Sequence, residues 1–284
     1  MDPHLLRTFV AVARLASFSA AARELGYTQS AVSQHIAALE GDLRTELLTR
    51  RPVAPTPAGD RLLEHAGPLL LRLDAARADV LRLAAAPPAR LTLAASPLAV
   101  GPRLLEALPA TGVTLRVLPP AEVPAAVAAG DCDLGLVDGP ASPSDPLRLP
   151  DVAPLTVTGL GEEELAVLFP AGHPFAGRAA VRLDDLTDAR WLDAPGVGLP
   201  LTAARAAVRY EGTDVRALCA LAAAGHGLVL LPRRVAEAAG AGSAVPLAAV
   251  PRLVHRTELL APGSSSGAAA ALAARLAAGS PYDS

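Results

Sequence analysis

The stretch of residues 58–86 constrains the fold most, because it reads as one long helix whose apolar residues recur at seven-residue intervals. Such a narrow, repeating stripe is typical of two helices packed as a coiled coil. The alternative is a helix packed on its own domain, since Leu63, Leu70 and Leu81 widen the apolar face. We predict that the helix joins two copies of the chain through Leu62, Leu69, Ala76 and Leu83, with Ala66, Leu73 and Val80 between them.

Prolines interrupt and end this helix. Pro68 lacks a backbone N–H and crowds the preceding turn, so we expect a bend near residues 64–68. Pro87 and Pro88 cannot continue the helix and are expected to form a stiff joint. The chain is therefore expected to divide into residues 1–58, a linker helix with a hinge at residues 59–89, and residues 90–284.

Residues 1–58 predict three short helices. Apolar residues at three- and four-residue steps indicate a helix over residues 4–16, and Gly26 ends a second, Ala-rich helix that follows Ser17. Thr28 can cap a third helix that reaches Leu39. A short helix, a turn and a further helix form a helix-turn-helix, whose second helix enters the major groove of DNA.

The third helix carries one face of hydrogen-bonding side chains, made by Gln29, Ser30, Ser33, Gln34 and His35. Amides and hydroxyls of this kind pair with base edges in the groove, although an ordinary solvated helix face has the same pattern. Further along, residues 49–53 predict a short basic hairpin of the size of a wing. Arg50 and Arg51 in this hairpin would suit phosphates.

Residues 90–284 alternate short β-rich runs with Ala- and Leu-rich helices. This order of strand, helix and strand implies a parallel sheet covered by helices on both faces. The expected strands are residues 91–95, 113–117, 132–137, 165–169, 208–210, 228–231 and 253–260, and the expected helices are residues 102–108, 123–129 and 266–278.

Composition argues against several classes of function. Aromatic residues are only 3% of the chain, which disfavours a base-stacking surface for nucleic acid. Cys132 and Cys219 lie in apolar surroundings and are expected to be reduced core thiols. The six His show no metal-ligand spacing and no Ser lies in a G-x-S-x-G motif, so we expect no metal, no cofactor and no enzyme. Residues 1–22 are unlike a signal peptide and no apolar run could span a membrane, so we expect a cytoplasmic protein.

An ordered series of residues runs through the chain. In the first part it comprises Phe9, Val12, Ala13, residues 17–22, Leu25, residues 28–33, Ile36, Leu39, Glu40, Leu47, Arg50, Thr56, Ala58 and Gly59. Later landmarks are residues 130–136, 165–168, 173–174, 183–186, 191–192, 224–228 and 231–232. In residue type and order this series closely resembles the LysR-type transcriptional regulators. The sequence departs from the family's usual residues at three positions, with Arg44 for Gly, Leu48 for Phe and Pro55 for Leu.

The resemblance implies an all-α winged helix-turn-helix, a long linker helix, and an α/β effector-binding domain of two lobes, similar to periplasmic binding proteins. Lobe I is expected at about residues 90–158 and 262–284, and lobe II at about residues 159–261. In this family His173 belongs to a turn without chemistry. The resemblance implies groove contacts by Thr28, Gln29, Ser30, Ser33, Gln34 and His35, and phosphate contacts by Ser17, Ser19, Arg50 and Arg51.

Ligands of open α/β sheets gather where strand ends meet helix N-termini, and here that place is the cleft between the lobes. Each candidate also has an ordinary interpretation: Ser96 as a helix cap, Asp138 as a turn residue and His226 as a surface turn. The candidates for effector binding are Ser96, Asp138, Thr156, Thr158, Gly196, Gly198 and His226.

The hypothesis is a DNA-binding transcriptional regulator, a homodimer or homotetramer on partly palindromic double-stranded DNA, with a small-molecule effector and RNA polymerase as further partners. Two alternatives stay open. One is a cytoplasmic solute carrier or sensor whose first domain makes only protein contacts, and the other is an enzyme acting in the cleft.

Overall fold

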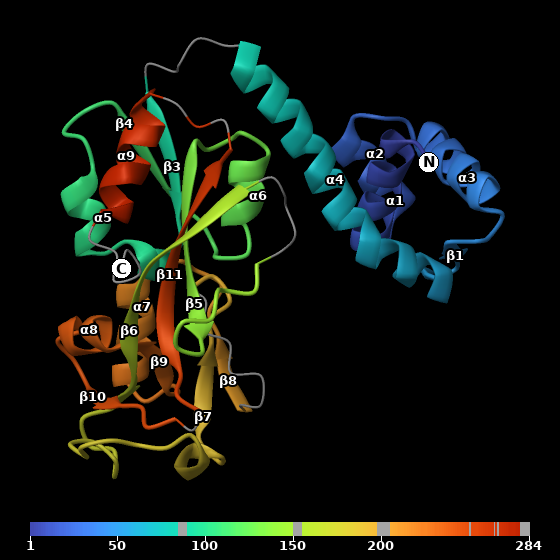
Figure 1. Cartoon of the computed structure of the whole chain (residues 1–284). Helices are drawn as coiled ribbons and strands as arrows, with labels where there is room; N and C mark the ends of the chain where they lie inside the picture. The colour runs from blue at the N-terminus through green and yellow to red at the C-terminus, as the bar shows by residue number, and fades with distance from the viewer. Residues whose placement is uncertain are drawn as a thin grey trace. The chain divides into compact units, whose positions relative to one another are not determined.

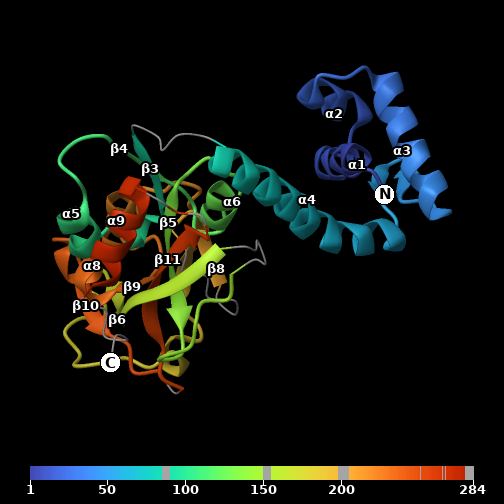
Figure 2. The same ribbon diagram turned by 45° about the horizontal axis from the view of Figure 1, so that its top comes forward.

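The computed structural model describes residues 1–84, 90–149, 155–197, 205–249, 251–263, 265 and 267–278. The chain divides into two compact units, Met1–Arg77 (unit 1) and Ala78–Ser284 (unit 2), whose elements are drawn in Figures 1 and 2. The expected joint at Pro87 and Pro88 lies outside the described residues.

Three helices open unit 1: α1 (Pro3–Leu15), α2 (Phe18–Leu25) and α3 (Gln29–Leu43). The side chains of Asp2, Ser17 and Thr28 each accept a backbone N–H from the first turn of the helix that follows. These caps satisfy donors that have no partner inside a helix. The predicted three helices are confirmed, and the third continues beyond Leu39 to Leu43.

All three helices end at a residue in the left-handed conformation. Gly26 has φ of 70° and ends α2, as predicted. Ala16 ends α1 with φ of 47°, and Arg44 ends α3 with φ of 53°. Arg44 therefore takes the conformation for which glycine is best suited.

The predicted wing forms a two-stranded antiparallel ribbon of β1 (Leu48–Arg50) and β2 (Val53–Pro55). Leu48 faces Pro55 across the ribbon, and its side chain is buried. The wing thus contains two of the three residues at which this sequence departs from the family pattern.

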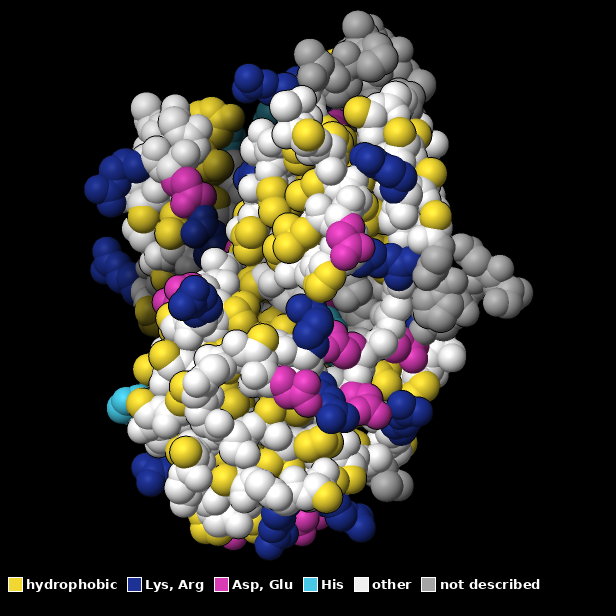
Figure 3. All heavy atoms as spheres, turned by 90° about the vertical axis from the view of Figure 1, so that its left-hand side faces the viewer, with side chains coloured by type: hydrophobic (Ala, Val, Ile, Leu, Met, Phe, Trp, Pro, Cys, Tyr) yellow, Lys and Arg dark blue, Asp and Glu magenta, His cyan; other side chains and the backbone are white. Residues whose placement is uncertain are grey.

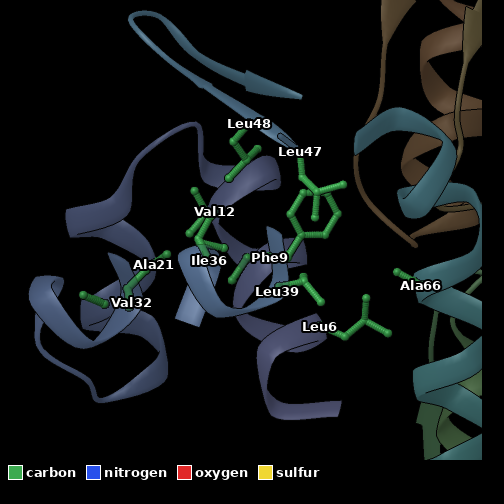
Figure 4. Packing of buried hydrophobic residues seen from close by; sticks show 12 residues of the cluster. Leu6, Phe9, Val12, Ala21, Val32, Ile36, Leu39, Leu47, Leu48 and Ala66 are labelled. Atoms are coloured by element: carbon green, nitrogen blue, oxygen red, sulfur yellow. The ribbon is translucent and has the colours of Figure 1, made fainter. Parts of the chain in front are cut away.

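The core of unit 1 lies where α1, α3 and the wing meet. Figure 4 shows Phe9, Val12, Ile36 and Leu39 pointing toward one another, with Leu47 and Leu48 from the wing beside them. The remaining members of this buried cluster are Leu6, Ala11, Ala21, Ala22, Val32 and Ala66. Ala66 shows that the next helix also closes this core.

The linker helix α4 (Pro57–Ala84) is continuous through Pro68. Its axis changes direction in its first half in both ribbon views, in line with the bend expected at the proline. Leu69, Leu73 and Val80 on the predicted seam are 45%, 43% and 66% exposed. In the single chain, the apolar side chains of the seam are therefore exposed to solvent at these positions.

In unit 2, three strands form the parallel part of the sheet: β3 (Leu91–Ala95), β4 (Val113–Val117) and β5 (Leu134–Ala141). Strand β3 lies between the other two, with Leu93 next to both Leu115 and Leu134. The elements around it are the 3-10 turn η1 (Pro97–Ala99) and the helices α5 (Pro102–Ala107), α6 (Val123–Ala128) and α9 (Gly267–Ala277).

Two long strands, β6 (Leu155–Phe169) and β11 (Val254–Pro262), cross from the first lobe into the second (Figure 1). The prediction of a wholly parallel sheet is wrong, because β11 pairs antiparallel with both β5 and β6. The two crossing strands run between the lobes in opposite directions, so they can pair side by side only as antiparallel neighbours. The sheet is therefore mixed.

The second lobe is built on the far half of β6, which β9 (Val229–Pro232) and β10 (Ser243–Pro246) flank as antiparallel partners. A separate parallel pair joins β7 (Arg190–Asp193) to β8 (Arg205–Arg209). Strands β7 and β10 were not predicted. The other elements of this lobe are α7 (Val215–Ala223), α8 (Arg233–Ala238) and η2 (Asp184–Leu186). No helix in the described part of the chain has the length and apolar character needed to cross a membrane.

Candidate functional site

The first turn of α3 presents an exposed group of polar side chains. Thr28 Oγ1 caps the helix by accepting the N–H of Ala31 at 3.2 Å, and it lies 3.0 Å from Ser30 Oγ. Gln29 Oε1 accepts the hydroxyl of Ser19 at 3.0 Å, which links α2 to α3. Thr28, Gln29, Ser30 and Ser19 are all exposed, so these groups can reach a partner outside the unit.

The next turn of α3 divides between an outward and an inward side. Gln34 is exposed, whereas Ser33 and His35 are half-buried. Nδ1 of His35 lies 3.1 Å from Thr8 Oγ1, and the ring packs edge-on against Tyr27 with 5.2 Å between ring centroids. His35 thus connects α3 to α1, and its expected groove contact stays a prediction.

Glu40 connects α3 to the wing. Its Oε1 accepts the backbone N–H groups of Leu47 and Leu48, and its Oε2 lies 3.3 Å from Arg50 Nη2. The guanidinium of Arg50 also lies over the ring of Phe18, 5.1 Å from its centroid. These contacts place Arg50 next to α2 and α3 with about half of its side chain exposed, and Arg51 at the turn is exposed as well.

The Ser17 hydroxyl accepts the N–H of Ala20 at 3.2 Å as the cap of α2. The expected DNA-contacting residues therefore lie at three places within unit 1: the start of α2, the first turns of α3, and the wing. These places belong to the helix-turn-helix and the wing that the sequence predicts, and the DNA contacts themselves stay a prediction.

Unit 2 contains a cavity of about 200 Å³, here called the interlobe cavity. It lies between the η1 turn and α5 of the first lobe, the crossing strands, and the start of α8 in the second lobe. Its apolar wall includes Leu98, Leu104, Leu136 and Leu160. Its titratable lining residues are Arg103, Glu162, Glu163, Arg234 and His255.

A buried series of hydrogen bonds leads from the cavity-lining residue His255 into the first lobe. The hydroxyl of Ser96 donates to Asp138 Oδ1, and Asp138 Oδ2 lies 2.9 Å from His255 Nε2. All three residues are at most 4% exposed. The carboxylate stands in the middle of this chain, whereas in a nucleophilic triad the imidazole stands in the middle, next to the serine. The arrangement therefore suits positioning of His255 better than activation of Ser96.

A second buried network lies on the face of β11 that is opposite to His255. Arg256 binds Glu162 through Nη1 and Glu258 through Nε, both at 2.8 Å. Glu258 Oε1 also accepts the N–H of Leu147 at 3.1 Å, while Glu258 Oε2 is buried without a hydrogen-bond partner among the described residues. These ionic contacts tie β11 to β6 where the strands cross.

The structure brings together only some of the predicted effector residues. Ser96 and Asp138 reach the interlobe cavity through His255, whereas Thr156 and Thr158 lie further toward the start of β6 and do not line it. Gly196 is buried where an added Cβ would lie 2.6 Å from the carbonyl oxygen of Gly212. His226 is exposed after α7, and Gly198 lies outside the described residues.

Three titratable groups elsewhere in unit 2 have shifted pKa values. Burial raises the pKa of Cys132, against the opposing effect of Arg116. Burial likewise raises the pKa of Cys219, and it lowers the pKa of His173. The two thiols are free and buried, which confirms the predicted core thiols. Among the described residues, no group of three His, Cys, Asp or Glu is placed to hold a metal ion.

Two family models match this chain. The model described as "Bacterial regulatory helix-turn-helix protein, lysR family" matches residues 3–60. The model described as "LysR substrate binding domain" matches residues 76–279. The chain belongs to the LysR family. The expected fold class, a winged helix-turn-helix followed by a two-lobed α/β domain, is confirmed.

Known relatives of this LysR-family chain are regulators. The HTH-type transcriptional regulator CysL of Bacillus subtilis (strain 168) is 28% identical over 198 residues, which are 66% of this chain and 63% of that protein. The small neutral protease regulatory protein of Streptomyces coelicolor is 31% identical over 221 residues, which are 75% of this chain and 66% of that protein. In both cases the matched stretch is less than two thirds of the relative's length.

The fold of the LysR-family chain is also that of the full-length regulator CbnR in its complex with target DNA. The crystal structure of CbnR superposes with a TM-score of 0.50 at 22% sequence identity, over 97% of this chain and 98% of that chain. At this identity the likeness concerns the fold alone.

Sequence reasoning missed the site roles of Glu40, Arg234, His255 and Arg256. A signal for two of them was present, because His255 and Arg256 stand together inside the apolar strand predicted over residues 253–260. Charged residues are rarely buried unless they are paired. A histidine and an arginine in a core strand therefore indicate carboxylate partners on the strands beside it.

Proposed function

We propose that this LysR-family chain is a cytoplasmic, DNA-binding transcriptional regulator that responds to a small-molecule effector. The observation that carries the proposal is the exposed polar turn of α3, held beside a basic wing. Gln29 and Gln34 can each form a bidentate pair with adenine, and the hydroxyls of Thr28 and Ser30 can bond to several base edges. Ser17, Ser19, Arg50 and Arg51 would fix the unit on the phosphates, while Ser33 and His35 lie at the edge of the contact.

The protein is proposed to act as a homodimer, or as a homotetramer built from dimers. Leu69, Leu73 and Val80 support this, because they lie at steps of four and seven residues on one helix and are widely exposed. Two DNA-binding units related by dimer symmetry would need a partly palindromic DNA site. A regulator of this kind would also contact RNA polymerase.

The effector is proposed to bind unit 2 in the interlobe cavity. The two lobes on either side of the cavity are proposed to be lobe I, about residues 90–158 and 262–284, and lobe II, about residues 159–261. Leu98 of the η1 turn belongs to the buried cluster of the second lobe, whereas Ala99 belongs to that of the first lobe. A ligand beside this turn could therefore favour one arrangement of the lobes, provided that it binds the two arrangements unequally.

The proposal is tested by selecting genomic fragments on the purified full-length chain and measuring affinity for the enriched site. Gln34→Ala is expected to weaken specific binding by about 1–3 kcal/mol, while binding to unrelated DNA changes little. Thr114→Ala, at an exposed position of the sheet edge in unit 2, is the matched control. A lack of DNA retention at low salt, or equal affinity of the two variants, would refute the assignment.

The dimer is tested separately by sedimentation of the full-length chain. Leu73→Glu places a charge on the open seam and is expected to yield monomers, because a charge in a coiled-coil seam is costly to bury. Val117→Glu changes an equally exposed residue of β4 and is expected to leave the dimer intact. Sedimentation of the unaltered chain as a monomer would contradict the proposal.

A further inference from the structure

We propose that the interlobe cavity takes a small zwitterion with a short aliphatic side chain, the chemical class of the apolar α-amino acids. This inference rests on the proposed function, since it names the ligand class of the effector site. It concerns unit 2 only, so it can fail while DNA binding by unit 1 holds.

The size and apolar wall of the cavity set the first limit. Its volume of about 200 Å³ holds only a small metabolite, because a water molecule in the liquid already occupies about 30 Å³. Leu98, Leu104, Leu136 and Leu160 are each at most 3% exposed, and they form an aliphatic wall. Such a wall suits a branched or linear aliphatic side chain.

The charged lining sets the second limit, because it carries both signs. Arg103, Arg234 and Glu163 line the same small space, and Arg234 lies 3.7 Å from Glu163. On the face of the molecule that Figure 3 shows, acidic and basic side chains likewise lie next to one another. A zwitterion can present its carboxylate to the arginines and its ammonium group to Glu163 in this confined site.

Arg103 is held by partners that leave its charge available, whereas Arg234 shares a carboxylate and stays partly exposed. Arg103 donates through Nε to the carbonyl oxygen of Leu276 at 3.0 Å, through Nη2 to that of Ala278 at 3.4 Å, and through Nη1 to that of Leu160. Carbonyl oxygens fix the guanidinium but do not neutralise it. Arg234 lies 3.7 Å from Glu163 and retains 46% exposure of its side chain. Both can attract the carboxylate of a ligand.

His255 supplies a matching acceptor for the ammonium group. A carboxylate only accepts hydrogen bonds, so Nε2 must carry the hydrogen in its contact with Asp138. In the neutral ring this leaves a lone pair on Nδ1, for which no partner is found among the described residues. His255 is 3% exposed and lines the cavity. An ammonium N–H donated to Nδ1, with Glu163 close by, completes the recognition of both ends of a zwitterion.

Occupancy at His255 can reach the η1 turn through Asp138. The same carboxylate that holds His255 accepts the hydroxyl of Ser96, and Ser96 immediately precedes η1. His255 is thus proposed as both a ligand contact and the first link to the turn that joins the cores of the two lobes.

The test compares matched probes on the full-length chain by isothermal titration calorimetry and thermal shift. The probes are L-alanine, L-valine and L-leucine, the corresponding acids without the amino group, and the corresponding amines without the carboxylate. At least one amino acid is expected to bind and raise the Tm, with its acid and its amine at least tenfold weaker. If an acid or an amine binds as tightly as its amino acid, or if no amino acid binds at millimolar concentration, the proposal is wrong.

His255→Gln provides the second arm. Its amide can still donate to Asp138, so the fold is retained, but it lacks the ring acceptor on the other side. Affinity for the amino acid is expected to fall at least tenfold, while DNA affinity without ligand is unchanged. His226→Gln, at an exposed position away from the cavity, is the control and should bind as the unaltered chain does. Equal affinity of both variants would overturn the role of His255.

Discussion

Oε1 of Glu40 accepts the backbone N–H of Leu47 at 2.9 Å, so a side chain of α3 fixes the chain at the entrance to the wing. The same oxygen accepts the N–H of Leu48 at 3.2 Å, and the other oxygen pairs with Arg50. The Glu40 side chain is only 13% exposed. One carboxylate therefore sets the position of the wing relative to the helix proposed to read DNA.

Glu40→Ala is expected to destabilise unit 1 by about 1–3 kcal/mol, because two backbone donors lose their acceptor in a partly buried place. Hydrogen exchange of the α3 amides would measure the loss. Glu24→Ala is the control: Glu24 pairs with Arg14 at an exposed position, and its loss is expected to cost less than about 1 kcal/mol. Similar losses in the two variants would show that the Glu40 contacts do not stabilise the wing.

Arg44→Gly is expected to stabilise unit 1 by about 1 kcal/mol. Arg44 has φ of 53°, where a side chain meets the following carbonyl group and glycine does not. Ala38→Gly, inside α3, is the contrasting variant and is expected to destabilise by about 1 kcal/mol because the helix interior disfavours glycine. Urea unfolding of the two variants would compare them, and a loss of stability in Arg44→Gly would contradict the argument.

Gly59→Ala and Gly67→Ala are expected to act in opposite directions, although both change a glycine of α4. At Gly59 a Cβ would lie 2.1 Å from the carbonyl oxygen of Leu47, so the helix start must shift, at a cost of about 1–3 kcal/mol. At Gly67 nothing lies within 4 Å, and alanine is expected to stabilise the helix by about 1 kcal/mol. Thermal unfolding followed by circular dichroism would decide, and two shifts of the same sign would refute the proposed crowding at Gly59.

The helix-turn-helix could be predicted from the sequence because its signals are local. Ser17 and Thr28 cap the helix that each precedes, and Gly26 ends the helix before it. The continuation of α3 to Leu43 was missed because an arginine, not a glycine, takes the left-handed conformation at its end. Glycine predicts a helix end because it readily adopts the left-handed conformation, whereas nothing in the residue type of Arg44 predicts that conformation.

The strand pairing in the sheet of unit 2 could be predicted only in part from local sequence signals. Strand β3 and its neighbours were predicted, but the antiparallel pairing of β11 with β5 and β6 joins segments far apart in the chain. Ser96 and Asp138 could be named because each follows the apolar run of a strand. His255 carried a signal as a titratable residue in an apolar strand, but its contact with Asp138 could not be predicted, since only the pairing of β11 with β5 brings the two together.

The two thiols lead to the last prediction, because burial raises the pKa of both Cys132 and Cys219 above the ordinary value of 9.0. In the unfolded chain both thiols titrate near that ordinary value. Their contribution to stability is therefore complete at lower pH. It declines as the pH rises above 9.0, because the unfolded chain then loses these protons before the folded protein does.

Iodoacetamide at neutral pH is therefore expected to label both cysteines slowly in the folded protein and quickly in urea, since the thiolate is the reactive form and both side chains are buried. Above about pH 9 the unaltered chain should lose stability more steeply than the double variant Cys132→Ala, Cys219→Ala, by up to about 1.4 kcal/mol per pH unit for each thiol. Mass spectrometry of the labelled peptides and thermal unfolding across this pH range would measure the two effects. Rapid labelling of either cysteine in the folded chain, or parallel pH profiles of the two proteins, would contradict the assignment of Cys132 and Cys219 as protonated core thiols.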